Sequence, residues 1–158
     1  MSAMAISTND VESANLLSLL EGEWSFERII SGHGEMAGAA SFHGQEDNSS
    51  IYSERGQLQL SAGGSPIEAY RQYIFAPTSI GFDVYFDENP RRLFHNVKLE
   101  AFDREICGAT VHLCVNDEYR TIYRFGLPTT FSIQHRVRGP KKDYTMDTKY
   151  WRANASTA

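Results

Sequence analysis

Hydrophobic and polar residues alternate along most of the chain. The clearest stretch is 130–138, in which one parity reads Phe131, Ile133, His135 and Val137. Because successive side chains of a β-strand point to opposite faces, this two-residue period predicts strands with one apolar face. The pattern recurs between turns rich in Gly and Pro and predicts about ten strands. Their expected ranges are 24–31, 36–43, 50–60 with a break near Gly56, 67–76, 79–86, 92–99, 106–115, 118–126, 130–138 and 143–152.

A helical period is confined to the beginning of the chain. Asn9 and Glu12 have the spacing of a capping box, and Gly22 is a residue that can end a helix. Between them, an apolar stripe is formed by Leu16, Leu17 and Leu20. We therefore expect one short helix at about residues 10–21.

The order of these elements predicts how the chain folds. Short turns favour antiparallel neighbours, and a meander of many strands removes its unpaired edges only by closing into a barrel. The expected fold is all-β: a single up-and-down antiparallel barrel of about 8–10 strands with a short N-terminal helix. The 158 residues predict a single domain, 1–158, with the barrel at 23–152 and a frayed tail at 153–158. A barrel of this size holds either a plug of side chains or one small ligand.

Composition and charge narrow the class of partner. A formal net charge of -5 disfavours nucleic acid as the main partner, because phosphate binding needs clustered Lys and Arg. No apolar stretch is long enough to span a membrane, and the N-terminus lacks the features of a secretion signal, so we expect a cytoplasmic protein. The nine Phe, eight Tyr and two Trp favour surfaces that enclose an apolar molecule. We expect a hydrophobic small-molecule ligand or substrate, no nucleic acid and no membrane; no feature of the sequence indicates the oligomeric state.

One segment departs from this acidic balance. Residues 136–142, RVRGPKK, concentrate basic side chains around a Gly-Pro turn. The simplest interpretation is a solvated hairpin tip, and a weaker one is a surface that binds a protein partner.

Strand parity selects the side chains that we expect inside the barrel. Strand 92–99 carries Leu93, His95, Val97 and Leu99 on one face. An inward Glu54 or Arg71 needs a partner, because a lone buried charge is costly. The candidate ligand-binding set is Tyr52, Arg71, Tyr73, His95, Cys114, Tyr119, Tyr123, Phe131, Met146 and Tyr150.

Strand 106–115 is ambiguous, because either of its faces can be turned inward. One face is apolar and includes Val111 and Leu113, whereas the other carries His112 and Cys114. If the apolar face points inward, His112 lies on the surface. If the polar face does, both residues join Tyr119 and His135 in a polar pocket.

Two sets of motifs resemble known families. Gly22-Glu23-Trp24, after a short helix, resembles the Gly-x-Trp signature of lipocalins, which implies a calycin/lipocalin-like barrel. That resemblance implies that Trp24 closes the barrel floor and that a basic residue, Arg152, packs over it. The second set is His112-x-Cys114-x-x-Asp117-x-Tyr119, Val137-Arg138-Gly139-Pro140-Lys141-Lys142-Asp143-Tyr144 and Tyr150-Trp151-Arg152.

This second set is similar to a small uncharacterised family, a domain of unknown function found in bacteria and fungi, with a lipocalin-like barrel. The resemblance extends from Leu19 to Arg152 and implies a fold rather than a reaction. It also favours the inward orientation of His112 and Cys114, because these residues carry the motif.

The chemistry of the expected interior suggests two functions. The scattered histidines form no zinc motif, and we expect neither metal nor cofactor. The first hypothesis is a cofactor-independent isomerase, cyclase or dehydratase of a hydrophobic metabolite in the barrel lumen. In it, His112, His135 and Glu54 transfer protons and the tyrosines and Arg71 position the substrate. The alternative is a non-catalytic, lipocalin-like binding or carrier protein. A further interpretation is that the polar groups only bond one another and water.

Overall fold

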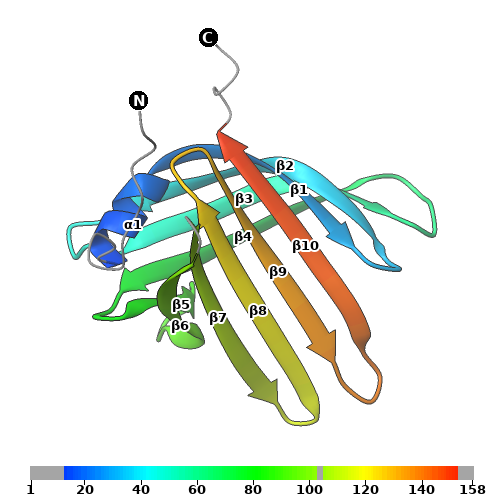
Figure 1. Cartoon of the computed structure of the whole chain (residues 1–158). Helices are drawn as coiled ribbons and strands as arrows, with labels where there is room; N and C mark the ends of the chain where they lie inside the picture. The colour runs from blue at the N-terminus through cyan, green and yellow to red at the C-terminus, as the bar shows by residue number, and fades with distance from the viewer. Residues whose placement is uncertain (1–12, 103–104, 153–158) are drawn as a thin grey trace.

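The structure, a computed structural model, describes residues 13–102 and 105–152. Helix α1 (Ser13–Leu20) precedes all the strands (Figure 1). The strands are β1 (Gly22–Ile30), β2 (Gly34–Gly44), β3 (Ser50–Leu60), β4 (Ile67–Pro77), β5 (Gly81–Phe86), β6 (Arg92–Phe102), β7 (Glu105–Cys114), β8 (Asp117–Gly126), β9 (Thr130–Arg138) and β10 (Asp143–Arg152). The capping signal at Asn9 and Glu12 and the tail at 153–158 lie outside the described residues.

The strands form one closed antiparallel barrel. Each strand pairs with its neighbour in sequence, and β1 pairs with β10 from Trp24↔Arg152 to Ile30↔Met146, which closes the sheet. The expected all-β, up-and-down barrel is confirmed, and the strand boundaries lie within three residues of those expected. The expected break near Gly56 is wrong, because β3 keeps its register with both neighbours through that residue. Closure leaves no unpaired edge in the sheet, which is why a meander of short hairpins is stable in this form.

Helix α1 lies at one end of the barrel, as Figure 1 shows, and packs its apolar stripe against β2 and β4. Leu16, Leu17 and Leu20 are buried, in agreement with the stripe seen in the sequence. The chain turns into β1 at Gly22, whose φ of 106° is one that a glycine adopts without steric cost. Within the described ranges, no helix has the length and apolar character of a membrane span.

Trp24 and Arg152 join the helix to the barrel. The Trp24 Nε1 donates a hydrogen bond to the Leu20 carbonyl at 2.9 Å. The guanidinium of Arg152 lies 3.9 Å from the centre of the Trp24 ring and donates to the carbonyls of Leu19 and Glu21 at 2.7 and 2.9 Å. These carbonyls, at and just beyond the C-terminal turn of α1, have no partner within a helix, so Arg152 satisfies them. The packing expected from the Gly-x-Trp signature is confirmed.

Replacing Arg152 by methionine should lower the free energy of unfolding by about 1–2 kcal/mol. The substitution removes both the contact with the Trp24 ring and the donors to the α1 carbonyls. Arg152→Lys should recover only part of the loss, because an ammonium lacks the planar fork that reaches two carbonyls. Urea denaturation measures the effect, with Arg138→Met, an exposed site on β9, as the control. Equal stability of the two methionine variants would contradict this role.

The part of the barrel next to α1 is filled by aromatic side chains. Trp24 meets Phe131 edge-on at 4.7 Å between ring centroids, and Phe42 meets Phe75 at 5.3 Å. Phe82 contacts Phe125 in the same way, at 6.1 Å. These rings are almost fully buried and form the floor above which the rest of the lumen lies.

Strand β6 departs from the alternation that its sequence predicts. Val84 pairs with His95, but Tyr85 pairs with Leu93, so Phe94 has no cross-strand partner. Such a β-bulge bends the strand and changes which side chains face inward. Leu93, expected on the same face as His95, is 47% exposed, whereas both Phe94 and His95 face the lumen.

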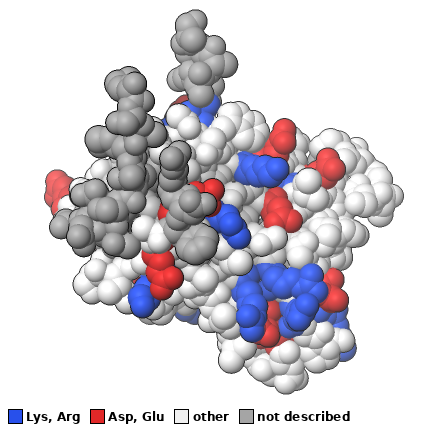
Figure 2. All heavy atoms as spheres, in the orientation of Figure 1, with Lys and Arg blue, Asp and Glu red and all other residues white. Residues whose placement is uncertain are grey.

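Basic side chains gather on the outer face of β8 and β9 (Figure 2). Arg120 and Arg136 face one another across the two strands. Arg120 pairs with Glu118 at 2.5 Å and Arg136 with Asp143 at 2.8 Å. The basic segment predicted around the β9–β10 turn is therefore partly neutralised by neighbouring carboxylates.

Candidate ligand-binding cavity

A cavity of about 380 Å³ occupies the lumen above the aromatic floor. It extends to Ile30, the last residue of β1, and to Tyr144, near the start of β10, at the barrel end opposite α1. Ten of the residues selected from the sequence line it: Tyr52, Glu54, Arg71, Tyr73, His95, Tyr119, Tyr123, His135, Met146 and Tyr150. The alternation of each strand brings them together, because inward positions from separate strands converge in a closed barrel.

Three sequence-selected residues are not part of the described cavity wall. Phe131 lies in the floor, where it stacks on Tyr150 at 4.1 Å. His112 is half-buried beside the cavity, with its ring 6.2 Å from those of both Phe94 and Tyr119. The side chain of Cys114 lies outside the described part of the structure.

The ambiguity of strand β7 is resolved by exposure. Val111 and Leu113 are 53% and 72% exposed, whereas Ile106 is buried and His112 is half-buried. The apolar face of this strand therefore points outward and its His112 face points inward. This is the orientation that the family resemblance favours.

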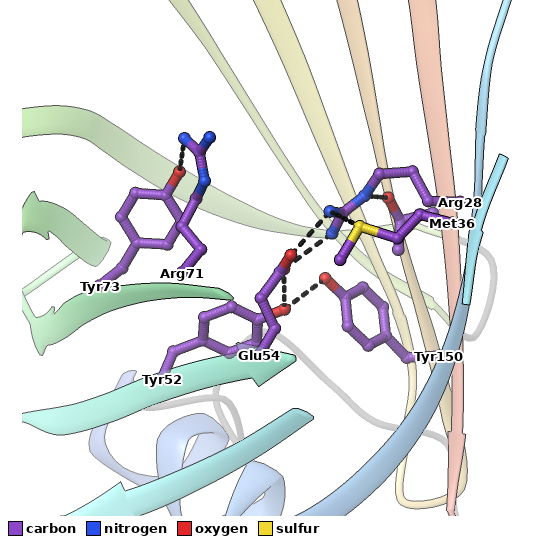
Figure 3. Close-up of polar contacts among 8 residues, drawn as sticks. Arg28, Met36, Tyr52, Glu54, Arg71, Tyr73 and Tyr150 are labelled. Atoms are coloured by element: carbon purple, nitrogen blue, oxygen red, sulfur yellow. Dashed lines mark hydrogen bonds and ion pairs between the residues drawn. The ribbon is translucent and has the colours of Figure 1, made fainter. Parts of the chain in front are cut away.

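A buried ion pair, Arg28–Glu54, lies in the wall of the cavity (Figure 3). The two Arg28 terminal nitrogens donate to the two Glu54 oxygens at 2.7 and 2.8 Å, and the Arg28 Nε donates to Thr148 at 2.8 Å. The side chains are only 13% and 4% exposed. Burial alone would raise the pKa of Glu54, but the hydrogen bonds and charge of Arg28 outweigh it and lower that pKa below its usual value. Both groups are therefore ionised at neutral pH.

Arg28 is the main residue that sequence reasoning missed. The expected need of Glu54 for a partner was correct, and Arg71 stands directly across from Glu54 in the pairing of β3 and β4. The carboxylate nevertheless binds Arg28, two strands away. The sequence did contain a signal that Arg28 points inward. In β1 it lies four residues after Trp24, so alternation places both side chains on the same, inward face. Phe94 was also missed, because the bulge in β6 cannot be read from alternation.

Two tyrosines extend the ion pair into a chain of hydrogen bonds. The Tyr52 hydroxyl donates to Glu54 at 2.6 Å and lies 2.8 Å from the Tyr150 hydroxyl, which must then donate to it. Burial raises the pKa of Tyr150 to about 12, and burial also raises the pKa of Tyr52 well above its ordinary value. Both phenols therefore keep their protons at neutral pH.

A second cluster, carried by β6, β8 and β9, contains two imidazoles. The His95 Nδ1 lies 2.8 Å from the Tyr123 hydroxyl, and the His135 Nδ1 lies 2.8 Å from the Thr121 hydroxyl. Burial, with a smaller effect of the His135 and His112 charges, lowers the pKa of His95 to about 3. Burial and the charge of Arg28 lower the pKa of His135 to about 4, against a weaker opposing effect of Glu54. Both rings are neutral at pH 7.

This arrangement limits the chemistry of the cavity. A neutral imidazole is a much weaker acid than imidazolium, and one whose pKa is near 4 is a weak base at pH 7. Glu54 accepts three hydrogen bonds and is tied to Arg28, so it is not a free base. In residues 13–102 and 105–152, no group of three His, Cys, Asp or Glu side chains is placed to hold a metal ion. The described geometry favours binding over proton transfer.

The fold and this site define a class of protein: closed β-barrels with an internal cavity large enough for a small ligand. The chain belongs to a family of unknown function, DUF6314, whose model matches residues 20–152. This agrees with the resemblance of its motifs to an uncharacterised family. No curated protein matches the sequence.

Several solved structures are similar to the chain. EF1p2_mFAP2b bound to DFHBI has a TM-score of 0.40 and 10% identity, over 89% of this chain and 98% of that chain. The redesigned β-barrel mFAP1, bound to DFHBI, has a TM-score of 0.39 and 10% identity, over 90% of this chain and 100% of its own. A de novo designed fluorescence-activating β-barrel has a TM-score of 0.39 and 11% identity, over 90% and 98% of the two chains.

Proposed function

We propose that the protein binds a hydrophobic small molecule in the barrel cavity and acts as a non-catalytic binding or carrier protein. The observation that carries this proposal is a cavity of about 380 Å³ whose inner polar groups are bonded mainly to one another. Ligand pockets typically measure about 300–1,000 Å³. A guest of modest size therefore fits without rearrangement of the barrel.

The walls suit an apolar and partly planar guest. Phe94 stacks on His95 at 3.7 Å between ring centroids and on Tyr73 at 5.7 Å, which fixes a flat aromatic surface at the lumen. Val84 and Ile133 add aliphatic surface to the same cavity. The imidazoles are neutral and hydrogen-bonded to Tyr123 and Thr121. An apolar guest that enters the cavity therefore pays little for the desolvation of polar groups.

The cofactor-independent isomerase or cyclase remains a second candidate because of one observation. The His135 ring lines the cavity with its Nδ1 held by Thr121, which leaves the position of its Nε2 fixed. A bound substrate with an acidic proton could meet that nitrogen. The pKa of about 4 opposes this role, because so weak a base removes a proton slowly at neutral pH.

The binding proposal is tested with N-phenyl-1-naphthylamine, an uncharged dye whose fluorescence rises in apolar surroundings. We expect saturable binding at one site per chain. Ala69→Phe should abolish it, because Ala69 lines the cavity and a phenyl ring there fills the lumen. Ala37→Phe, an exposed site on β2, should bind as the original chain does. Thermal unfolding shows whether both variants are folded, and equal dye binding by both would contradict a site in the lumen.

The two candidate functions differ in what His135 does. Native mass spectrometry of the purified protein first identifies a co-purifying small molecule. If the protein is a carrier, His135→Phe changes only the affinity for that molecule. If it is an isomerase or cyclase, the wild type converts the molecule into an isomer or a dehydration product, and His135→Phe abolishes conversion while affinity is nearly unchanged.

A further inference from the structure

We propose that the ligand carries an oxyanion, such as a carboxylate, which binds to the guanidinium of Arg71 and the hydroxyl of Tyr73. This inference rests on the proposed binding function and specifies the chemical class of the guest: a hydrophobic acid rather than a neutral or cationic molecule.

The charges of the cavity wall do not cancel. Among the described lining residues, the ionised side chains at neutral pH are Arg28, Glu54 and Arg71. Arg28 and Glu54 neutralise one another, and His95 and His135 carry no charge. Two cations and one anion leave one positive charge at the site. A guest with one negative charge would make the occupied cavity neutral.

The two arginines are not equivalent in their hydrogen bonds. Every nitrogen of the Arg28 guanidinium donates to a partner within the barrel. Arg71 is exposed. Among the described residues, it donates only to the Tyr73 hydroxyl, at 3.2 Å, and takes part in none of the ion pairs. A guanidinium has five N–H donors, so most of those on Arg71 remain for a ligand. Its planar fork matches the two oxygens of a carboxylate.

The position of Arg71 also fits an amphipathic guest. Figure 3 shows Arg71 and Tyr73 together, separated from the cluster of Arg28, Glu54 and Tyr150. The Tyr73 ring stacks on Phe94 with an angle of 22° between planes, so the charged group adjoins the aromatic wall. An acid can thus place its apolar body against this wall while its oxyanion meets Arg71 in the wetter part of the site.

The experiment uses two dyes that share one skeleton. N-phenyl-1-naphthylamine is neutral, and 8-anilino-1-naphthalenesulfonate is the same molecule with an added sulfonate. Both are titrated into the original chain, Arg71→Gln and Arg124→Gln. Arg124 is an exposed arginine on the outward face of β8, so its variant loses the same charge away from the cavity. Ala69→Phe reports any dye bound outside the lumen.

We expect Arg71→Gln to weaken binding of the sulfonate dye by about tenfold and to leave the neutral dye within about twofold. Arg124→Gln should change neither by more than about twofold. If Arg71→Gln weakens both dyes alike or neither, the oxyanion site is overturned while binding in the lumen stands. If the original chain binds neither dye, both the binding function and the oxyanion site are overturned. Thermal unfolding confirms that the exposed substitutions leave the fold intact.

Discussion

Replacing Arg28 by methionine is expected to lower the free energy of unfolding by about 3–5 kcal/mol. The substitution leaves Glu54 buried without its cation, and the remaining hydrogen bond from Tyr52 does not compensate for the lost solvation of a carboxylate. Part of the cost is removed if Glu54 takes up a proton, so the destabilisation should be larger at pH 8 than at pH 5. Urea denaturation at the two pH values measures both effects.

Substitution of Glu54, alone and together with Arg28, separates the energetic cost of an unpaired charge from the cost of lost packing. Glu54→Gln alone should also destabilise the fold, because the Arg28 charge then lacks its carboxylate. The double variant, Arg28→Met with Glu54→Gln, should regain much of the loss, because no unpaired charge remains and the amide can still accept from Tyr52. Arg55→Met is the control, since the Arg55–Glu68 pair is exposed at 3.6 Å and should contribute at most about 1 kcal/mol. A loss at Arg28 no larger than that at Arg55 would mean that Glu54 is effectively solvated.

The barrel could be predicted from sequence because the physical signal for it is local. In β9, for example, alternation alone placed His135 inside, where it lines the cavity, and Gln134 outside, where it is exposed. Short turns then required antiparallel neighbours, and the need to pair every edge required closure. Each of these steps uses only the spacing of residues along the chain.

The details of the site could be predicted less well, because they depend on contacts between distant strands. Alternation identified Glu54 as inward but could not show that Arg28, rather than the facing Arg71, binds it. That choice depends on the curvature of the barrel and on the third donor bond, from Arg28 to Thr148. The bulge at Phe94 is a change of register, which the alternating pattern of a single strand does not encode.

Protonation was the property least visible in the sequence. A histidine inside a barrel can be an acid, a base or a neutral hydrogen-bonding group, according to its burial and its neighbours. His95 is almost completely buried, and the charge of Arg28 further disfavours protonation of His135. Both facts depend on the three-dimensional arrangement. They favour a binding function over proton transfer, because they keep the two imidazoles neutral.

Acidification from pH 6.5 to pH 5 should destabilise the protein strongly through His95 and His135. Their pKa values of about 3 and about 4 in the folded state lie below the ordinary value of 6.5, so the unfolded chain binds protons first as the pH falls. The free energy of unfolding therefore decreases below about pH 6.5, by up to about 1.4 kcal/mol per pH unit for each histidine. This loss continues until the folded protein also takes up protons, near pH 4 for His135 and near pH 3 for His95.

The measurement is urea denaturation at constant ionic strength, in small pH steps between 7.5 and 5. Glu54, whose pKa is lowered, also loses its stabilising contribution in acid, but only below its ordinary value of 4.5, so this window isolates the histidines. His135→Gln should reduce the slope against pH by about half, because one of two equivalent proton-binding groups is removed and the amide can still bond to Thr121. His43→Gln, at an exposed site on β2, is the control for the loss of an imidazole outside the lumen. An unaltered slope in the His135 variant would mean that this imidazole titrates freely in the folded barrel. The conclusion that burial keeps His135 neutral in the cavity wall would then be wrong.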